Sequence, residues 1–524
     1  MSASREKKNR QELSASGIPD VKDIRAAEDR KQQRRSNWLY GSIAVIFVLV
    51  AAALLVWNSN IIQRGTTAIT VDGEKYTAAE VSYFYRSAYN SLANSQYASY
   101  IGLDPSKPLD QQTLNDTAKM MLGISSEEEM TYQQYFMDST KKSLVELTVM
   151  LRKAEEDGYT FTEEMQADVD ATLKSVDEAA KSNGMSSGAY LKALFGPNMT
   201  SGTFEKVLKD SVLVSHYMKS HQESLSYTDE QIESYYQGHK ANFDVAAYDY
   251  IYFKGTAPST TDEDGKSVPP TEEENKAAAE KAQVAAEEAL ARFQNGESLE
   301  NIAKDYEIGS YFSQTGATNY GDTMSNWLFD DARKAGDTEI LESNGNRYLM
   351  LFHSRGRNEY DTVNVRHILC KLDTTGLDPK AEDYETKLAA LKEEQKAEAD
   401  KILQEWKDAG ATEEAFAELA EKYSDDGGSN TNGGLYTQVS KGRMVPEFND
   451  WIFDESRKAG DSDILFVESS NYSGYHVMYF SGYDAPFWKL QVKGAMSQED
   501  FTKWHDELIK DITATENSGM KYVG

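Results

Sequence analysis

Two histidines and one aspartate in the second half of the chain have types and positions that could do chemistry. His367 lies in the apolar strand pattern VRHIL, His476 lies in the strand pattern YHVMYF, and Asp426 follows a helical pattern. Imidazole and carboxylate groups can hydrogen-bond to one another and to a polar substrate group without a nucleophile or a metal. Taken singly, each has an ordinary explanation. Strand histidines are usually hydrogen-bonded core residues, and an aspartate after a helix can simply end it.

The stretch that holds these residues is one of two copies of a domain. Residues 327–340 read WLFDDARKAGDTEI and residues 451–464 read WIFDESRKAGDSDI, at an offset of 451 − 327 = 124. Upstream, the strand patterns that begin at Asp249 and Arg366 match at an offset of 366 − 249 = 117. The sequence therefore predicts two tandem copies of one small domain. The second copy is longer by 124 − 117 = 7 residues, in a loop rich in Gly, Ser and Asn.

The order of motifs in the second copy resembles that of the parvulin-type peptidyl-prolyl isomerases. A histidine in the first strand, an aspartate after the first helix, a Met-x-Pro-x-Phe segment and Ser-Gly-x-His before the last strand follow one another. The resemblance implies four catalytic residues, His367, Asp426, Ser473 and His476. It also implies three substrate-binding residues in a proline pocket, Tyr436, Met444 and Phe448. The family more often has Asp-Leu where this chain has Leu435-Tyr436, so Tyr436 is placed by register alone.

The chemistry of this family explains why such residues are needed. Rotation about a peptide C–N bond has a barrier of about 18–20 kcal/mol, and at X-Pro bonds it takes tens to hundreds of seconds uncatalysed. An enzyme gains by binding the twisted imide better than either planar form, with an apolar pocket for the ring and polar groups near the carbonyl and nitrogen. No bond is broken, so we expect no cofactor and no metal. Met444 and Phe448 at helical spacing, or a Ser473-Gly474 turn, would each be unremarkable alone; their joint occurrence favours the site.

The first copy is a natural comparison for the second. At the matched positions, Tyr250 stands for His367 and Gly309 for Asp426. Tyr348 stands for His476 if the final strands are paired as LMLF with VMYF. The first copy also lacks the loop glycines and the Met-x-Pro-x-Phe segment. We therefore expect it to fold like the second copy without isomerising proline, and to serve in binding or spacing.

The N-terminal part of the chain predicts a membrane anchor. Residues 38–57 read WLYGSIAVIFVLVAAALLVW, uncharged and with aromatic residues at both ends, which is typical of a single transmembrane helix. Residues 1–37 carry ten Lys or Arg and six Asp or Glu, which predicts that they form a basic cytoplasmic tail. We therefore expect a single-pass protein of a bacterial cell membrane, with the chain after the helix outside the cytoplasm. A cleaved signal peptide is the alternative, but the apolar run is long for one and no small-x-small cleavage site follows it.

The rest of the chain predicts an α+β protein with several domains. We expect a mostly helical, chaperone-like domain and two parvulin-like domains, each an antiparallel sheet with surrounding helices, followed by a C-terminal segment whose helix packs on the helical domain. The stretches DGEKYTAAEVSYFY and YTDEQIESYY of the helical part resemble the chaperone domain of PrsA-like and SurA-like extracytoplasmic foldases. The predicted ranges are 66–243 (helical), 244–357 (degenerate parvulin), 361–484 (parvulin) and 485–524 (C-terminal).

The net charge narrows the possible binding partners, and the cysteine content excludes a disulfide within one chain. The net charge is −31, and subtracting the tail's +4 leaves −35 on the remainder, which argues against nucleic acid or anionic lipid as its partner. Cys370 is the single cysteine and lies in an apolar strand pattern, so one chain cannot form a disulfide.

Three functions fit the sequence. The first is a peptidyl-prolyl isomerase and foldase that acts on unfolded or newly exported polypeptides. The second is a non-catalytic holdase chaperone whose parvulin copies only bind polypeptide. The third is a scaffold attached to the export machinery, favoured only by the basic tail, which is usually just a topology signal.

Overall fold

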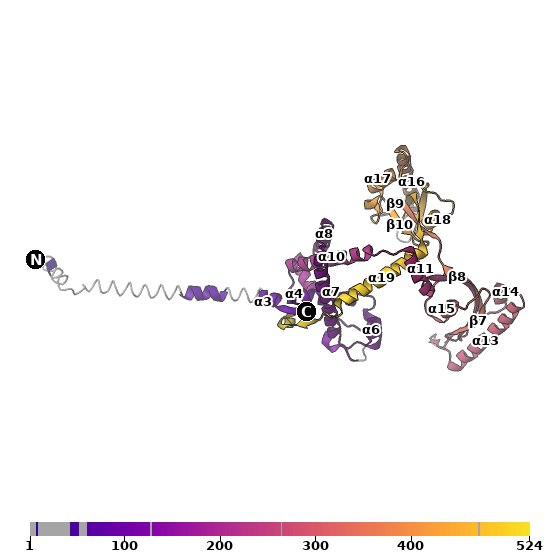
Figure 1. Ribbon diagram of the computed structural model, residues 1–524, viewed down its shortest axis with the longest axis horizontal. Coiled ribbons are helices and arrows are strands. Elements are labelled where there is room, and N and C mark those ends of the chain that lie inside the picture. The colour runs from indigo at the N-terminus through magenta and orange to yellow at the C-terminus, as the bar shows by residue number, and fades with distance from the viewer. Residues whose placement is uncertain (1–6, 9–41, 52–59, 126–127, 264, 470–471) are drawn as a thin grey trace. The chain divides into compact units, whose positions relative to one another are not determined.

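The protein is described here from a computed structural model, which has an α+β architecture (Figure 1). The described residues are 7–8, 42–51, 60–125, 128–263, 265–469 and 472–524. The chain divides into two compact units, one formed by Met1–Leu225 with Phe501–Gly524 and the other by Ser226–Asp500. We call them the helical unit and the sheet unit, and each is described by itself.

The predicted transmembrane helix over residues 38–57 is wrong. No helix among the described residues is both long enough and apolar enough to cross a membrane. Within the predicted span the described residues are 42–51, and they are helical. Residues 38–41 and 52–57, with most of the predicted basic tail, lie outside the described residues.

The helical unit is built on long amphipathic helices with polar caps. Its main helices are α4 (Ala78–Ala93), α7 (Tyr132–Glu156), α8 (Glu163–Ser182), α9 (Ser187–Phe195) and α10 (Ser201–Ser224). Thr77 caps α4 and forms a capping box with Glu80, and Thr131 does the same for α7 with Gln134. Before α4, strands β1 (Thr67–Val71) and β2 (Glu74–Thr77) form a hairpin whose turn residues have positive φ, as the Asp-Gly sequence predicts.

The C-terminal residues complete the helical unit. Within residues 501–524, Trp504 and Leu508 of helix α19 (Phe487–Ile509) pack on the apolar cluster that contains Leu144 and Tyr217. The chain then forms β13 (Ala514–Glu516), which pairs antiparallel with β1 and widens the hairpin to three strands. The structure thus adds a strand pairing that the sequence analysis did not foresee.

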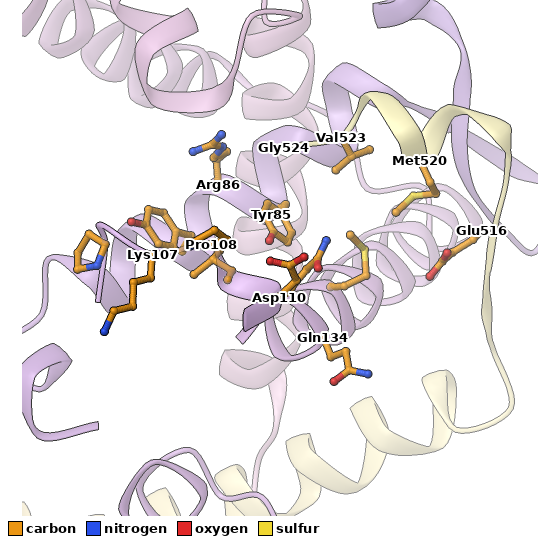
Figure 2. Close-up of a pocket in the computed structure, with 15 residues that line it drawn as sticks. Tyr85, Arg86, Lys107, Pro108, Asp110, Gln134, Glu516, Met520, Val523 and Gly524 are labelled. Atoms are coloured by element: carbon orange, nitrogen blue, oxygen red, sulfur yellow. The ribbon is translucent and has the colours of Figure 1, made fainter. Parts of the chain in front are cut away.

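A surface cavity of about 710 Å³ lies in the helical unit (Figure 2). Its wall combines residues of α4 and α7 with residues from the C-terminal stretch 516–524. It includes Tyr85, Pro108, Met137 and Met520. Nearby, the short helices α5 (Ala98–Ile101) and α6 (Asp116–Met121) belong to a segment that carries several exposed apolar side chains.

The sheet unit contains two four-stranded antiparallel sheets with one topology. The first copy has the strand order β6-β3-β8-β7, and the second has β10-β9-β12-β11. The strands of the first copy are β3 (Asp244–Phe253), β6 (Gly309–Ala317), β7 (Thr338–Ser343) and β8 (Asn346–Arg357). Those of the second are β9 (Asp361–Lys371), β10 (Leu435–Val439), β11 (Ser462–Glu468) and β12 (Ser473–Pro486). The matched order is the structural counterpart of the sequence repeat.

Helices cover matching positions on the two sheets. The first copy uses α13 (Glu272–Gln294), α14 (Leu299–Ala303) and α15 (Thr323–Leu328), and the second uses α16 (Tyr384–Asp408), α17 (Glu413–Tyr423) and α18 (Pro446–Ile452). In the second copy α16 and α17 bury a cluster with Ile368 and Val477 of the central strands. Val363, Val365 and Phe480 pack with α18 in another cluster.

The repeated WxFDxxRKAGD segment is a structural motif. Arg333 stacks over the ring of Trp327 at 4.1 Å and donates to its carbonyl oxygen at 3.1 Å. Arg457 does the same with Trp451, at 4.0 Å and 3.1 Å. Both tryptophans are buried. The segment therefore has the same packing role in both copies, where it joins the helix to the sheet.

Candidate active site

The two central strands of the second copy bring the predicted histidines together. In the antiparallel pair of β9 and β12, His367 lies opposite Met478 and His476 lies opposite Leu369. The histidines are therefore diagonal neighbours on one face of the sheet. Their rings stack with centroids 5.0 Å apart, and their Nδ1 atoms are 2.9 Å apart, a hydrogen-bond distance. Both side chains are almost completely buried.

The loop after α17 brings Asp426 to the first histidine. Its backbone is tied to β9, because Asp425 N–H donates to the Leu369 carbonyl at 2.9 Å and Leu369 N–H donates to Ser424 Oγ at 3.1 Å. Asp426 Oδ2 lies 2.8 Å from Nε2 of His367. The carboxylate is therefore held at the end of a line that runs through both histidines.

Two hydroxyl groups complete the surroundings of this carboxylate. Ser429 Oγ donates to Asp426 Oδ2 at 2.6 Å, and the Tyr436 hydroxyl donates to the same oxygen at 2.9 Å. The register prediction placed Tyr436 in the pocket wall, and its ring lies 5.5 Å from that of His367. The structure gives this side chain a polar contact as well as an apolar one.

The electrostatics of the cluster follow from these contacts. The hydrogen bond from His367, supported by those from Ser429 and Tyr436, holds the pKa of Asp426 well below its usual range even though burial opposes this. Burial, together with the neighbouring His367, lowers the pKa of His476 to about 3. At neutral pH the cluster therefore contains an ionised carboxylate and a neutral His476.

Two consecutive glycines shape the loop that approaches His367. Gly433 and Gly434 both have a φ of +71°, in the left-handed region that favours glycine. Gly434 accepts a hydrogen bond from His367 N–H at 3.0 Å, and a Cβ atom on Gly434 would lie 2.2 Å from the His367 carbonyl oxygen. Only glycine permits this close contact between loop and strand.

Substitution of Gly434 by alanine should therefore destabilise the second copy by about 2–4 kcal/mol, through backbone strain and the clash with His367. Hydrogen exchange of the β9 and β12 amides in the full chain measures this loss. Gly427→Ala is the matched control, because a Cβ there meets nothing within 4 Å and its φ is not in the positive region. Equal protection in the two variants would contradict the proposed contact.

An apolar wall stands beside the polar cluster. Phe448 is 2% exposed, and its ring meets those of His367 and His476 edge-on with centroids at 5.5 Å and 5.7 Å. Met444 and Tyr436 are partly buried and pack in the same apolar cluster. The three predicted pocket residues thus lie together, next to the histidine pair.

The structure does not bring Ser473 to this cluster. Side chains alternate between the faces of a strand, and Ser473 is three residues from His476 on β12, so the two point to opposite faces. Ser473 instead lines a polar hollow with Lys371 and Thr374. The serine that contacts the carboxylate of Asp426 is Ser429.

Two contributors were missed by sequence reasoning. Ser429 lies in the elaborated loop GGSNTNGGLY, whose presence in the second copy alone was a signal that the loop serves the site. Tyr472 precedes β12, and its hydroxyl lies 3.1 Å from Nε2 of His476. No spacing rule singles out either residue, because only the folded loop and hairpin determine where their hydroxyls lie.

The first copy replaces the polar cluster with aromatic rings. Its β3–β8 register pairs Tyr250 with Met350 and Tyr252 with Tyr348, which matches His367 with Met478 and Leu369 with His476 in the second copy. Tyr250 stacks on Phe312 of β6 with centroids 5.0 Å apart. Strand β6 begins at Gly309 and pairs with β3. In the second copy, the corresponding part of β9 is contacted by the loop that contains Gly434. The carboxylate and both imidazoles therefore have no counterpart at these matched positions.

Comparison with known proteins agrees with this geometry. Residues 349–480 match the family model of the PPIC-type PPIase domain. These residues form a parvulin-type PPIase domain. The sequence-based prediction of a parvulin-type peptidyl-prolyl isomerase is confirmed by this match, which covers β9, the loop between α17 and β10, and β12 as far as residue 480.

Curated relatives extend the likeness beyond the parvulin domain. The chain is 26% identical over 324 residues to the chaperone SurA of Chromohalobacter salexigens, and 25% identical over 323 residues to that of Methylobacillus flagellatus. Each match covers 59% of this chain and 65% of the relative. The chain thus spans about two thirds of the length of these relatives, and the predicted resemblance to SurA-like foldases is confirmed.

Solved structures of foldases also match parts of the chain. PrsA from Bacillus anthracis matches at 13% identity and a TM-score of 0.17, covering 70% of this chain and 93% of that one. PrsA from Streptococcus pneumoniae matches at 13% identity and a TM-score of 0.21, covering 73% and 88%. Scores this low do not establish a shared overall fold.

Proposed function

We propose that the protein is a parvulin-type peptidyl-prolyl cis/trans isomerase and foldase that acts on unfolded polypeptides outside the cytoplasm. The observation that carries the proposal is the continuous line of hydrogen bonds from Asp426 through His367 to His476, beside the apolar wall of Phe448. The likeness to the SurA chaperones supports the role in folding, and the extracytoplasmic location stays a prediction. Contact with the export machinery stays a prediction.

The geometry fits catalysis by preferential binding of a twisted imide. Phe448, Met444 and the Tyr436 ring offer an apolar surface for the proline ring, which remains apolar throughout rotation. As the imide twists, conjugation is lost, and charge shifts between its nitrogen and its carbonyl group. The ionised Asp426, held by three side-chain donors, supplies a fixed charge beside that surface.

The hydrogen bonds around the site keep the polar groups from having to reorganise during the reaction. Buried histidines in a defined hydrogen-bonded arrangement are already oriented before substrate arrives, so their dipoles cost little to align at the transition state. Neither imidazole needs to act as a nucleophile, because no covalent bond of the substrate is made or broken. We assign the roles of His367, His476 and Asp426 to electrostatic preorganisation and that of Phe448 to binding the ring.

A second function, retention of unfolded chains, is favoured by the surface of the helical unit. The segment that holds α5 and α6 exposes Tyr100 at 71% and Met120 at 77% of their surfaces, with Tyr97 and Met121 partly exposed beside them. Methionine side chains adapt to varied apolar partners. These exposed residues and the cavity lined by Tyr85, Pro108 and Met520 (Figure 2) support polypeptide binding by the helical unit.

The isomerase proposal is tested by matched substitutions in the two copies. His476→Phe removes a central imidazole. Tyr348→Phe introduces phenylalanine at the equivalent position of the first copy. In a protease-coupled assay on a proline peptide, the full chain with His476→Phe should lose about tenfold in rate or more, since a buried hydrogen-bonding partner is worth roughly 1–3 kcal/mol. Tyr348→Phe should match the wild type. Equal rates in the two variants would contradict placement of catalysis in the second copy.

A further inference from the structure

A hollow of about 590 Å³ lies in the first copy, between helix α13 and the segment that follows α14. We call it the α13 groove. Its apolar lining includes Ala285 and Ile308, and Val284 lies beside them with 54% of its surface exposed. The groove therefore offers apolar surface to a partner.

The lining of the α13 groove is acidic. It holds four carboxylates and one lysine, which gives a formal charge of 1 − 4 = −3 at neutral pH. One of the carboxylates, that of Asp305, is paired with Arg292 at 2.7 Å. In the part of the chain that the structure describes, no lysine, arginine or histidine pairs with the other three, Glu280, Glu288 and Glu307. The groove thus combines apolar surface with carboxylates that can still accept a cation.

The second copy has the same elements in the same register, so it serves as a comparison. Ala282 of α13 and Ala399 of α16 are completely buried, at an offset of 399 − 282 = 117. Leu299 of α14 and Phe416 of α17 are buried at the same offset, 416 − 299 = 117. Residues of the α13 groove can therefore be matched one by one with residues of the second copy.

In the second copy, a carboxylate and a tyrosine ring hold two lysines of the same copy. Lys422 Nζ lies 3.3 Å from the Glu405 carboxylate and 4.4 Å from the centre of the Tyr423 ring. Lys401 Nζ lies 5.8 Å from the same ring. The Tyr423 hydroxyl donates to Glu405 at 2.9 Å. The carboxylate and the ring thus form one acceptor for cations.

The first copy retains this acceptor and has lost both lysines. Glu288 and Tyr306 are the equivalents of the carboxylate and the ring at the offset of 117. The two lysines are replaced by Val284 and Asp305, which removes two positive charges and adds one negative charge. Arg292, one turn along α13 from Glu288, is paired with Asp305 instead. Glu288 therefore lacks the cation that its equivalent has.

We propose that the α13 groove binds a basic segment of an unfolded client polypeptide. A lysine or arginine of the client contacts Glu288 and the Tyr306 ring, and the apolar residues next to it cover Val284. The net charge of −31 attracts such segments to the protein. This inference deepens the proposed foldase function and rests on it for the nature of the partner. Because the isomerase site lies in the second copy, the two sites contact different segments of a client.

The test measures peptide binding by the full chain. The probe is a short fluorescein-labelled peptide of repeated Leu-Lys-Ala units, which contains no proline. The comparison peptide has glutamate in place of every lysine. Fluorescence anisotropy should show that the wild type binds the lysine peptide about tenfold or more tightly than the glutamate peptide, because several exposed charge pairs act together.

Two matched substitutions locate the binding. Val284→Lys restores the lysine of the second copy and should lower the affinity for the lysine peptide about 5- to 10-fold, because its own cation competes for Glu288. Lysine is at least as favourable as valine in a helix, so α13 should keep its structure. Val268→Lys is the control, since it adds the same charge on strand β5 (Ser267–Val268), where Val268 is 40% exposed and outside the groove. Its affinity should stay near that of the wild type.

Each outcome decides the inference. Equal affinities of Val284→Lys and Val268→Lys would overturn it, as would a wild type that binds both peptides equally. Deletion of residues 1–37 should leave the affinity unchanged, and tighter binding by the shortened chain would assign the groove to the protein's own basic tail instead. The isomerisation rate on a proline peptide should be the same in both variants. A wild type without isomerase activity that still shows the groove-dependent binding would refute the isomerase function and leave the class of groove ligand unchanged.

Discussion

Replacement of Asp426 by alanine is expected to lower the isomerisation rate by on the order of 100-fold, the usual effect of removing one preorganised polar group from an active site. The carboxylate is the shared acceptor for His367, Ser429 and Tyr436, and all three lose it together. The site also loses its fixed negative charge. The protease-coupled assay on the full chain measures the change.

Folding should survive this substitution. Unpaired donors cost about 1–3 kcal/mol, which is less than the 5–15 kcal/mol of a typical domain. Asp425→Ala is the neighbouring control, because that carboxylate accepts from Lys371 N–H at the end of β9 rather than from the histidines. A similar loss of rate in both variants, or an unfolded Asp426→Ala chain, would favour a purely structural role for the carboxylate.

Truncation after Asp500 is expected to destabilise the helical unit by roughly 5 kcal/mol or more. The deletion removes Trp504, whose ring stacks on His221 at 3.8 Å, with Leu508 and Ile512, which pack on the same apolar cluster. Each large side chain contributes about 1.5–3 kcal/mol when buried. The deletion also removes β13, so the sheet returns to a two-stranded hairpin, which is marginal in water.

This truncation should leave the isomerase in place. Asp426, His367 and His476 lie in the sheet unit, whose residues 226–500 are all retained. Hydrogen exchange of the α4 and α7 amides should show the loss of stability of the helical unit. The isomerisation rate on a short proline peptide should stay near that of the full chain. Unchanged protection in α7 would refute the packing of the C-terminal residues on these helices.

The repeat allowed much of the second copy to be predicted from sequence. Matching the final strands of the two copies made Tyr348 the equivalent of His476. The strand registers agree, because the two residues have equivalent partners on the neighbouring strand. The start of helix α4 was also readable, because Thr77 caps it through a side-chain oxygen at a spacing that the sequence reveals. Local rules worked where local contacts determine the structure.

Other features depend on contacts that no local pattern encodes. The pairing of β13 with β1 joins residues more than 440 positions apart, Ile69 with Glu516 among them. Ser473 was predicted from the family motif, but it points to the other face of β12. Ser429, which contacts Asp426, lies in a loop that the glycine pair brings close to His367. The apolar run near the N-terminus met every compositional test for a membrane helix, and the described residues contain none.

The central claim is most directly tested by NMR exchange spectroscopy of a proline peptide with a catalytic amount of the full chain. Uncatalysed isomerisation takes tens to hundreds of seconds, so cross-peaks between the cis and trans resonances at mixing times below a second report catalysis. We predict such cross-peaks with the wild type and their near-complete loss with Asp426→Ala. Their absence with the wild type, or equal intensity with both proteins, would contradict the assignment of the Asp426–His367–His476 cluster as the isomerase site.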